Sequence, residues 1–133
     1  MAAQGRKNVH GKTGVRFKAA YTASKNKSML RNVVTDLILN GEVRVTSGVV
    51  KELRKLADHL VTLAKRNDLH ARRLAAQTVR TNVEKDGKDA LTVLFGELGP
   101  RMASRNGGYT KAFKLGPRRG DCAEVVLVRW SDL

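Results

Sequence analysis

The 133-residue sequence predicts an α+β domain in which a small mixed sheet packs against helices and a basic arm precedes the domain. Apolar residues recur at helical spacing in four segments, and three further segments have the alternation or the β-branched composition of strands. The order along the chain is helix, strand, three helices, two strands. A chain of this length suits one domain with a modest core. We therefore expect a basic extension at residues 1–28 and a single globular domain at residues 29–133.

The first helix and the first strand are predicted between residues 30 and 46. Asn40-Gly41 supplies a helix stop, because glycine readily adopts the left-handed conformation that ends a helix. Residues 42–46 alternate, with Val43 and Val45 on one face, which indicates a short strand. The apolar residues of the first helix are Leu30, Val33, Val34, Leu37 and Ile38.

Three helices are predicted to follow this strand. The first can be capped by Thr46 or Ser47, since a hydroxyl accepts a hydrogen bond from a free backbone N–H group. Asp68 can cap the second helix, and Gly99-Pro100 is expected to end the third after a loop at residues 84–88. The apolar positions are Val49, Val50, Leu53, Leu56, Ala57, Leu60, Leu63 and Ala64, then Leu69, Leu74, Ala75 and Val79, then Leu91, Leu94, Phe95 and Leu98.

Two strands are predicted near the C-terminus. Asn106-Gly107-Gly108 breaks the chain, and residues 109–115 then alternate as a strand does. Residues 116–121 form a turn region. Residues 125–130 are rich in β-branched side chains and complete the sheet.

The net charge of +14, from 26 Lys and Arg against 12 Asp and Glu, predicts a polyanionic partner. Nucleic acid, an anionic membrane surface and an acidic protein all fit this charge. The charge is concentrated in two blocks without a carboxylate, at residues 1–35 and 98–120. Residues 36–97 carry a net +2 and residues 121–133 a net −2. This asymmetry favours a defined binding face or arm, and it favours nucleic acid among the partners.

The basic residues of the two blocks are the candidate binding residues. Arg101 and Arg105 are four apart, so a helical turn would place both on one side. Phe17 and Tyr21 could stack on unpaired bases or anchor the arm on the domain. Tyr109 could also stack on a base or fill the core, and we favour the core. The candidates are Arg6, Lys7, Lys12, Arg16, Lys18, Lys25, Lys27, Arg31, Arg101, Arg105, Lys111, Lys114, Arg118 and Arg119.

Several other classes of function are disfavoured. The chain has no run of about eighteen apolar residues and no apolar signal-peptide stretch near its start, so we expect a cytoplasmic protein without a membrane partner. The single cysteine, Cys122, cannot form an internal disulfide, which fits a reducing compartment. Gly11-Lys12-Thr13 is similar to the end of a phosphate-binding loop, but Gly5 lies one residue too far upstream for the required spacing.

No catalytic or metal site is predicted. His10, His59, His70 and Cys122 do not form a metal-ligand pattern, and nothing in the sequence supplies a base that would activate Cys122. Neither basic block contains the carboxylates that a metal-dependent nuclease needs. We therefore expect that the chain is not an enzyme.

The most specific motifs of the chain are LFGELGPR at residues 94–101 and SRNGGYT at residues 104–110, followed by LG at 115–116 and GD at 120–121. Further motifs are MLRN at 29–32, KELRK at 51–55 with LAK at 63–65, and RRLA at 72–75. With these motifs in this order from about Met29 to about Val128, the sequence strongly resembles the bacterial large-subunit ribosomal protein L17 family.

The resemblance implies a structural constituent of the ribosome that binds and stabilises large-subunit ribosomal RNA near the peptide exit tunnel, beside neighbouring large-subunit ribosomal proteins. It also implies a compact α+β domain, an arm that enters the RNA, no catalytic activity, no cofactor and no small-molecule substrate. The family usually has a short basic arm with a His-Arg pair before the first helix, whereas residues 23–28 here read ASKNKS and the arm is longer. The competing hypothesis, which fits the charge alone, is a nucleoid-type basic DNA-binding protein.

Overall fold

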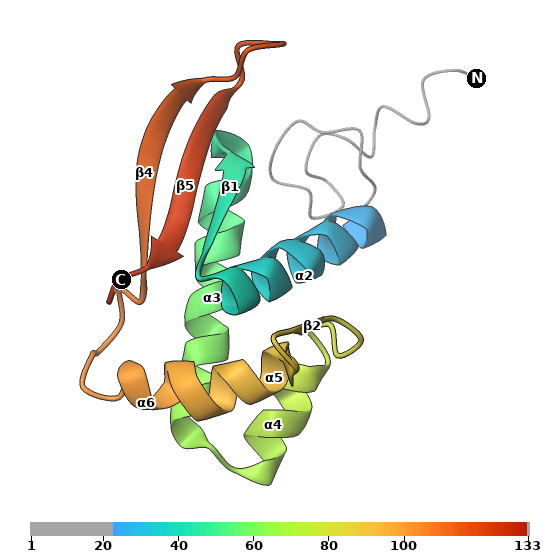
Figure 1. The fold of residues 1–133 in the computed structure, drawn as a ribbon, viewed down its shortest axis with the longest axis vertical. Coiled ribbons are helices and arrows are strands. Elements are labelled where there is room, and N and C mark those ends of the chain that lie inside the picture. Colours follow the sequence, from blue (N-terminus) through green and yellow to red (C-terminus); the bar gives the residue numbers. More distant parts are fainter. Residues whose placement is uncertain (1–22, 133) are drawn as a thin grey trace.

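The structure is a computed structural model that describes residues 23–132, and the predicted α+β class is confirmed (Figure 1). A sheet lies at one end of the molecule, helix α3 runs along its length, α2 crosses α3, and the remaining helices gather at the opposite end. Most of the predicted arm lies outside the described residues. The elements are α2 (Ala23–Asn40), β1 (Glu42–Thr46), α3 (Ser47–Arg66), α4 (Leu69–Ala76), β2 (Glu84–Lys85), β3 (Lys88–Asp89), α5 (Ala90–Val93), the π-helix η1 (Leu94–Leu98), α6 (Gly99–Arg101), β4 (Thr110–Pro117) and β5 (Glu124–Trp130).

Helix α2 begins earlier than its apolar period indicated. Ala23–Ser28, which we expected within the arm, forms the first turns of the helix. A tertiary contact supports them, because the Arg80 side chain donates a 2.9 Å hydrogen bond to the Ser28 hydroxyl. The end of the helix agrees with the prediction. Gly41 has a φ of 82° and its N–H donates to the Leu37 carbonyl at 2.9 Å.

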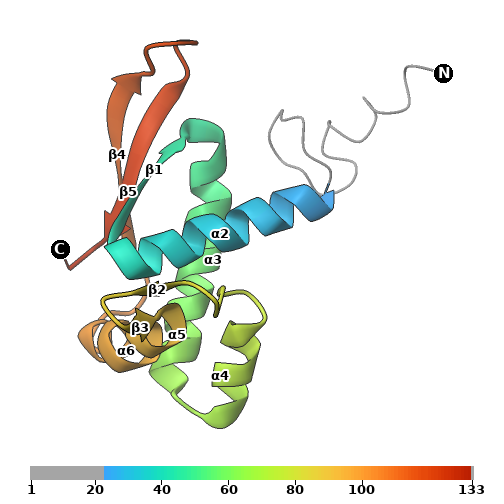
Figure 2. The same ribbon diagram turned by 45° about the vertical axis from the view of Figure 1, so that its right-hand side comes forward.

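The main sheet has three strands in the order β1-β5-β4, and all its pairings are antiparallel where we expected a mixed sheet. Strands β4 and β5 are joined by a short turn, which allows only an antiparallel pair. The inner face is apolar, with Val43 opposite Val128 and Val45 opposite Val126. Figure 2 shows that α2 and α3 lie on one side of this sheet and that the β4–β5 hairpin extends beyond them.

Helix α3 supplies the centre of the core. Its predicted face is buried at Val49, Leu53, Ala57, Leu60, Leu63 and Ala64, with Val50 and Leu56 partly buried. Val61 is also fully buried, which the single stripe did not predict. The reason is that α3 contacts α2, β5, η1 and α6, so its buried surface extends well around the helix.

Trp130 joins the sheet to the helical layer. Its side chain is 1% exposed, and its indole Nε1–H donates to the Leu37 carbonyl of α2 at 3.1 Å. A buried indole requires such an acceptor, because an unpaired N–H away from water costs free energy. The end of β5 and the end of α2 are thereby held together.

The predicted stop at Gly99-Pro100 is wrong, because the helical segment continues to Arg101. A π-turn precedes the proline, and the Gly99 N–H donates to the Leu94 carbonyl, five residues back. Proline lacks an N–H and crowds the carbonyl four residues before it, and a wider turn accommodates both effects. Gly99 also packs closely on α3, since a Cβ built there would lie 3.0 Å from the Ala64 carbonyl oxygen.

Residues 84–89, part of which we expected to form a loop, make a small hairpin of β2 and β3. Asp86 and Gly87 occupy its two-residue turn with φ values of 55° and 75°. Asp-Gly is a preferred pair for such a turn, because both central residues need positive φ. Asp68 caps α4 as predicted, and its carboxylate accepts from the Ala71 N–H at 2.6 Å.

Candidate nucleic-acid interface

The predicted basic residues are distributed over three regions of the chain. Arg6, Lys7, Lys12, Arg16 and Lys18 lie outside the described residues, as do Phe17 and Tyr21. A second group lies on α2. A third group lies between α6 and the tip of the β4–β5 hairpin.

On α2, Lys25 and Lys27 are exposed, whereas Arg31 is part of the fold. The Arg31 Nε–H donates to the Thr78 carbonyl at 3.1 Å and so ties α2 to the segment after α4. Arg80 makes a second tie, with its Nε–H donating to the Asn32 side chain at 3.0 Å. The charge pattern of the sequence could not distinguish Arg31, which ties two elements together, from Lys27, which is exposed.

A cavity of about 610 Å³ lies beside this part of α2. Basic side chains from α2 and α3 line it together with apolar side chains of the same helices. Lys55 and His59, which also line it, lie within the charge-balanced middle of the chain and so were not among the candidate binding residues. The lining residues are Lys27, Leu30, Arg31, Glu52, Lys55, Leu56, His59, Gln77 and Thr78.

The four-residue spacing suggested that a helical turn places Arg101 and Arg105 on one side, but the two residues do not share a helix. Helix α6 ends at Arg101, and the Arg105 N–H donates to the Met102 carbonyl in a turn. Arg101 pairs with Asp132 at 2.6 Å, next to the end of β5. The Arg105 side chain is exposed and has no hydrogen bond or ion pair within residues 23–132.

Tyr109 fills the core, as we predicted. It is 5% exposed, and the Lys65 ammonium donates to its hydroxyl at 3.2 Å and lies 5.4 Å from the ring centroid. Lys65 also donates to the Arg105 carbonyl at 2.8 Å. These contacts fix the loop that leads from α6 into β4.

The outer face of the sheet combines basic and apolar side chains. Lys111 lies opposite Arg129, and the Arg129 guanidinium lies 5.9 Å from the ring centroid of Phe113. Phe113 is 46% exposed and Leu115 is 49% exposed, so this face is not covered by any described element. Strand alternation predicts which side chains of one strand share a face. The register between β4 and β5 is also needed to place Arg129 opposite Lys111.

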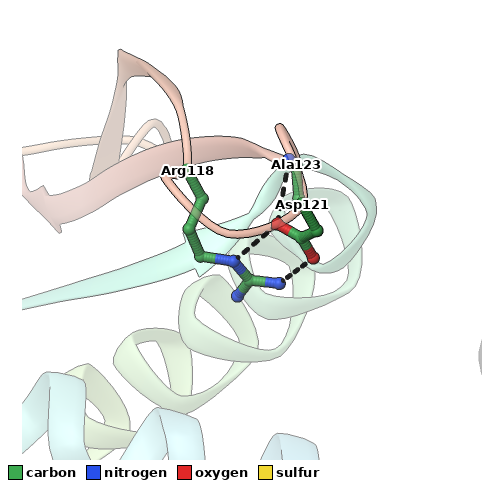
Figure 3. Close-up of polar contacts among 3 residues, drawn as sticks. All are labelled: Arg118, Asp121 and Ala123. Atoms are coloured by element: carbon green, nitrogen blue, oxygen red, sulfur yellow. Dashed lines mark hydrogen bonds and ion pairs between the residues drawn. The ribbon is translucent and has the colours of Figure 1, made fainter.

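The tip of the β4–β5 hairpin is a small polar structure built around Asp121 (Figure 3). The Arg118 Nε–H donates to Asp121 Oδ1 at 3.0 Å and its Nη2 donates to Oδ2 at 2.6 Å. Asp121 Oδ1 also accepts from the Ala123 N–H at 3.1 Å. These hydrogen bonds, first that of Arg118, lower the pKa of Asp121 from 3.8 to about 2.

The backbone of the tip is closed by two further hydrogen bonds. The Arg118 N–H donates to the Ala123 carbonyl at 2.7 Å, and the Cys122 N–H donates to the Arg118 carbonyl at 2.9 Å. Cys122 has a positive φ of 57° and is exposed. Below the tip, the ammonium of Lys114 lies 3.6 Å from the carboxylate of Glu124.

The third group therefore forms an extended line and not one compact patch. Arg105 and Lys111 lie at the base of the hairpin, and Arg118 and Arg119 lie at its tip, seven strand steps or about 23 Å away. Arg105, Lys111 and Arg119 are exposed and unpaired within the described part of the chain. Such a line of cations suits contact with a long polyanion.

The described residues 23–132 contain neither a metal-ligand cluster nor a helix that could span a membrane. No group of three or more His, Cys, Asp or Glu side chains there could hold a metal ion. Among the helices of this part of the chain, none has the length and apolarity needed to cross a membrane.

Comparisons with known proteins agree on one family. A family model described as Ribosomal protein L17 matches residues 29–130 of the chain. The chain is 45% identical over 115 residues to the large ribosomal subunit protein bL17 of Shouchella clausii (strain KSM-K16). That alignment covers 85% of this chain and 96% of the relative.

Proposed function

Because the chain belongs to the bacterial ribosomal protein L17 family, we propose that it binds and stabilises large-subunit ribosomal RNA near the peptide exit tunnel. Membership of this family makes the chain a structural component of the ribosome and not an enzyme. Its place is the large ribosomal subunit, in the cytoplasm of a bacterium. Its partners there are ribosomal RNA and neighbouring ribosomal proteins.

The observation that carries the RNA-binding proposal is the line of exposed cations along the β4–β5 hairpin. The side chains of Arg105, Lys111 and Arg119 have no hydrogen-bond or ion-pair partner within residues 23–132, so nothing in the described fold accounts for their charge. Lysine and arginine that neutralise phosphates release condensed counterions, which drives binding to RNA. A hairpin that projects beyond the helices can reach phosphates that a flat surface cannot.

The arm extends this proposal to the N-terminus. We assign residues 1–28 to an RNA-binding extension and residues 29–133 to the globular domain, with Ala23–Ser28 already helical at the junction. The extension carries seven basic residues and no acidic residue. A basic segment of this kind often orders when it binds its partner.

Crosslinking within purified large subunits tests the proposal. Ultraviolet crosslinking followed by mass spectrometry identifies peptides joined to nucleotides. We expect crosslinks from the hairpin, at residues 105–119, and from residues 1–28 to large-subunit RNA close to the tunnel exit. Crosslinks to RNA remote from the tunnel exit would contradict the location, and the absence of RNA crosslinks from both regions would contradict RNA binding.

A further inference from the structure

The tip of the β4–β5 hairpin has the form of a binding element more than that of a packing element. Residues 117–122 are all exposed, and the tip projects beyond α2 and α3 (Figures 1 and 2). It contributes no residue to the hydrophobic core of the described chain. Its conformation is nevertheless fixed, by the two backbone hydrogen bonds and by the contacts of Asp121.

Asp121 is an unexpected residue at this position if charge were the only requirement. It lies next to the basic block and reduces the positive potential at the tip, which weakens attraction to a polyanion. Its ion pair with Arg118 is about half exposed on both sides, and exposed pairs contribute little to the stability of a fold. We therefore expect Asp121 to act by fixing the geometry of the tip and not by adding to the stability of the fold.

That geometry orients the Arg118 guanidinium. Two of its five N–H donors, on Nε and Nη2, are held by the two oxygens of Asp121 in a fork. The plane of the group is thereby fixed, and its three other N–H donors have no acceptor within residues 23–132. Arg119, the next residue, is exposed and unpaired in the same part of the structure.

We propose that the hairpin tip is a preorganised site for the phosphate backbone of ribosomal RNA, in which Asp121 is a positioning residue that holds Arg118 for the contact. The inference rests on the proposed function and deepens it. Arg118 donates its remaining N–H groups to a phosphate, and Arg119 supplies a second cation. Because the side chain is oriented before binding, less conformational entropy is lost on contact.

A purely electrostatic role and a positioning role for Asp121 predict opposite changes in RNA affinity when the residue is replaced. In a purely electrostatic account, Asp121→Asn raises the net charge from +14 to +15 and tightens binding to RNA. In the positioning account, the same substitution releases Arg118 and weakens binding. A charge-matched control is Glu84→Gln, since Glu84 is exposed on the β2–β3 hairpin, away from this tip.

The test measures binding of the full-length protein to protein-free large-subunit ribosomal RNA by filter binding over a range of salt concentrations. We expect Asp121→Asn to weaken binding by about tenfold and to lower the salt slope by about one, as the loss of a single phosphate contact does. Glu84→Gln should leave the affinity within about twofold or tighten it slightly. Unchanged or tighter binding by Asp121→Asn would overturn the proposal.

A double variant separates positioning from a general structural role. If Asp121 acts through Arg118, then Arg118→Ala with Asp121→Asn should bind as weakly as Arg118→Ala alone. Arg118→Lys should not keep the RNA affinity of the unmodified protein, because an ammonium lacks the planar fork of a guanidinium. Additive losses in the double variant would contradict the assignment. If the unmodified protein did not bind the RNA, the proposed function itself would fail, which is a distinguishable result.

Discussion

Individual arginines of this chain have two kinds of task. Arg54 on α3 donates to the Thr110 hydroxyl at 3.2 Å and to the Thr110 carbonyl at 3.1 Å, and so fixes the start of β4. Arg31 has a similar role toward Thr78. Arg105 and Arg119 make no such contact within the described residues. Arginine thus supplies both side chains that hold the fold together and side chains that remain exposed without a partner in the described part of the chain.

This division could not be read from the sequence. The acid-free blocks predicted where binding cations lie, but Arg31 and Arg101 within them are engaged by Thr78 and by Asp132. These partners are 47 and 31 residues away along the chain. A contact between such distant residues depends on the fold as a whole, so charge pattern alone does not reveal it.

The titration of Asp121 tests the contacts at the hairpin tip. Its pKa in the folded chain is lowered from 3.8 to about 2, so its ionised form stabilises the tip above pH 3.8 and this contribution is lost as the pH falls through about 2. We expect a midpoint of about 2 for the Asp121 carboxyl in a titration followed by nuclear magnetic resonance. In Arg118→Ala the midpoint should move toward 3.8. A midpoint near 3.8 in the unmodified protein would contradict the ion pair.

At the scale of elements, local signals placed most helices and strands. Strand β1 has the predicted bounds, and the caps at Asp68 and Gly41 are where turn chemistry placed them. The end of the helical segment from Ala90 to Arg101 was not predicted correctly, because a proline within a helical pattern normally indicates a helix end. Close packing of Gly99 on α3 favours continuation of the helix, and this tertiary contact has no local sequence signal.

Substitution of Gly99 tests that contact between helices. A Cβ at this position would lie 3.0 Å from the backbone oxygen of Ala64, and a backbone atom cannot move aside as a flexible side chain does. We expect Gly99→Ala to lower the free energy of unfolding by about 1–3 kcal/mol, as overpacking does. Urea denaturation measures this change. The control is Gly96→Ala, where no atom lies within 4 Å of the added Cβ.

The control variant should behave in the opposite way. Gly96 lies in the same helical segment, so Gly96→Ala should leave stability unchanged or raise it by up to about 1 kcal/mol. Equal destabilisation by the two substitutions would indicate a general intolerance of the π-turn. In that case the packing of Gly99 against Ala64 would not be the cause.

On the scale of the whole molecule, the sheet and helices form a support from which the basic β4–β5 hairpin projects. The core joins α2, α3, the α5–α6 segment and the sheet. The hairpin lies at the end of the molecule opposite α4 and α5. Among the described residues, the basic side chains of the hairpin are thus held away from the core by the packed helices and the sheet.

Removal of residues 1–22 tests the contribution of the N-terminal segment. The truncation lowers the net charge from +14 to +9, because it removes five basic residues and no acidic residue. We expect the truncated chain to keep its circular dichroism spectrum and melting temperature, since the described core lies in residues 30–130. Its association with large subunits should weaken. A full-length variant with the five basic residues replaced by glutamine serves as the control for length.

The two variants together separate charge from chain length. Similar weakening in both would assign the effect to phosphate contacts made by the basic residues. Full association of the truncated chain with large subunits would contradict the assignment of this segment to RNA binding.

Sedimentation of the endogenous full-length protein tests the central claim most directly. A cell extract is layered on a sucrose gradient in high salt with magnesium, and the protein is detected across the fractions. As a structural component of the large subunit, it should sediment with that subunit even at a salt concentration where loose phosphate binding is lost. Release to the top of the gradient at high salt, or sedimentation with DNA in place of large subunits, would contradict the account.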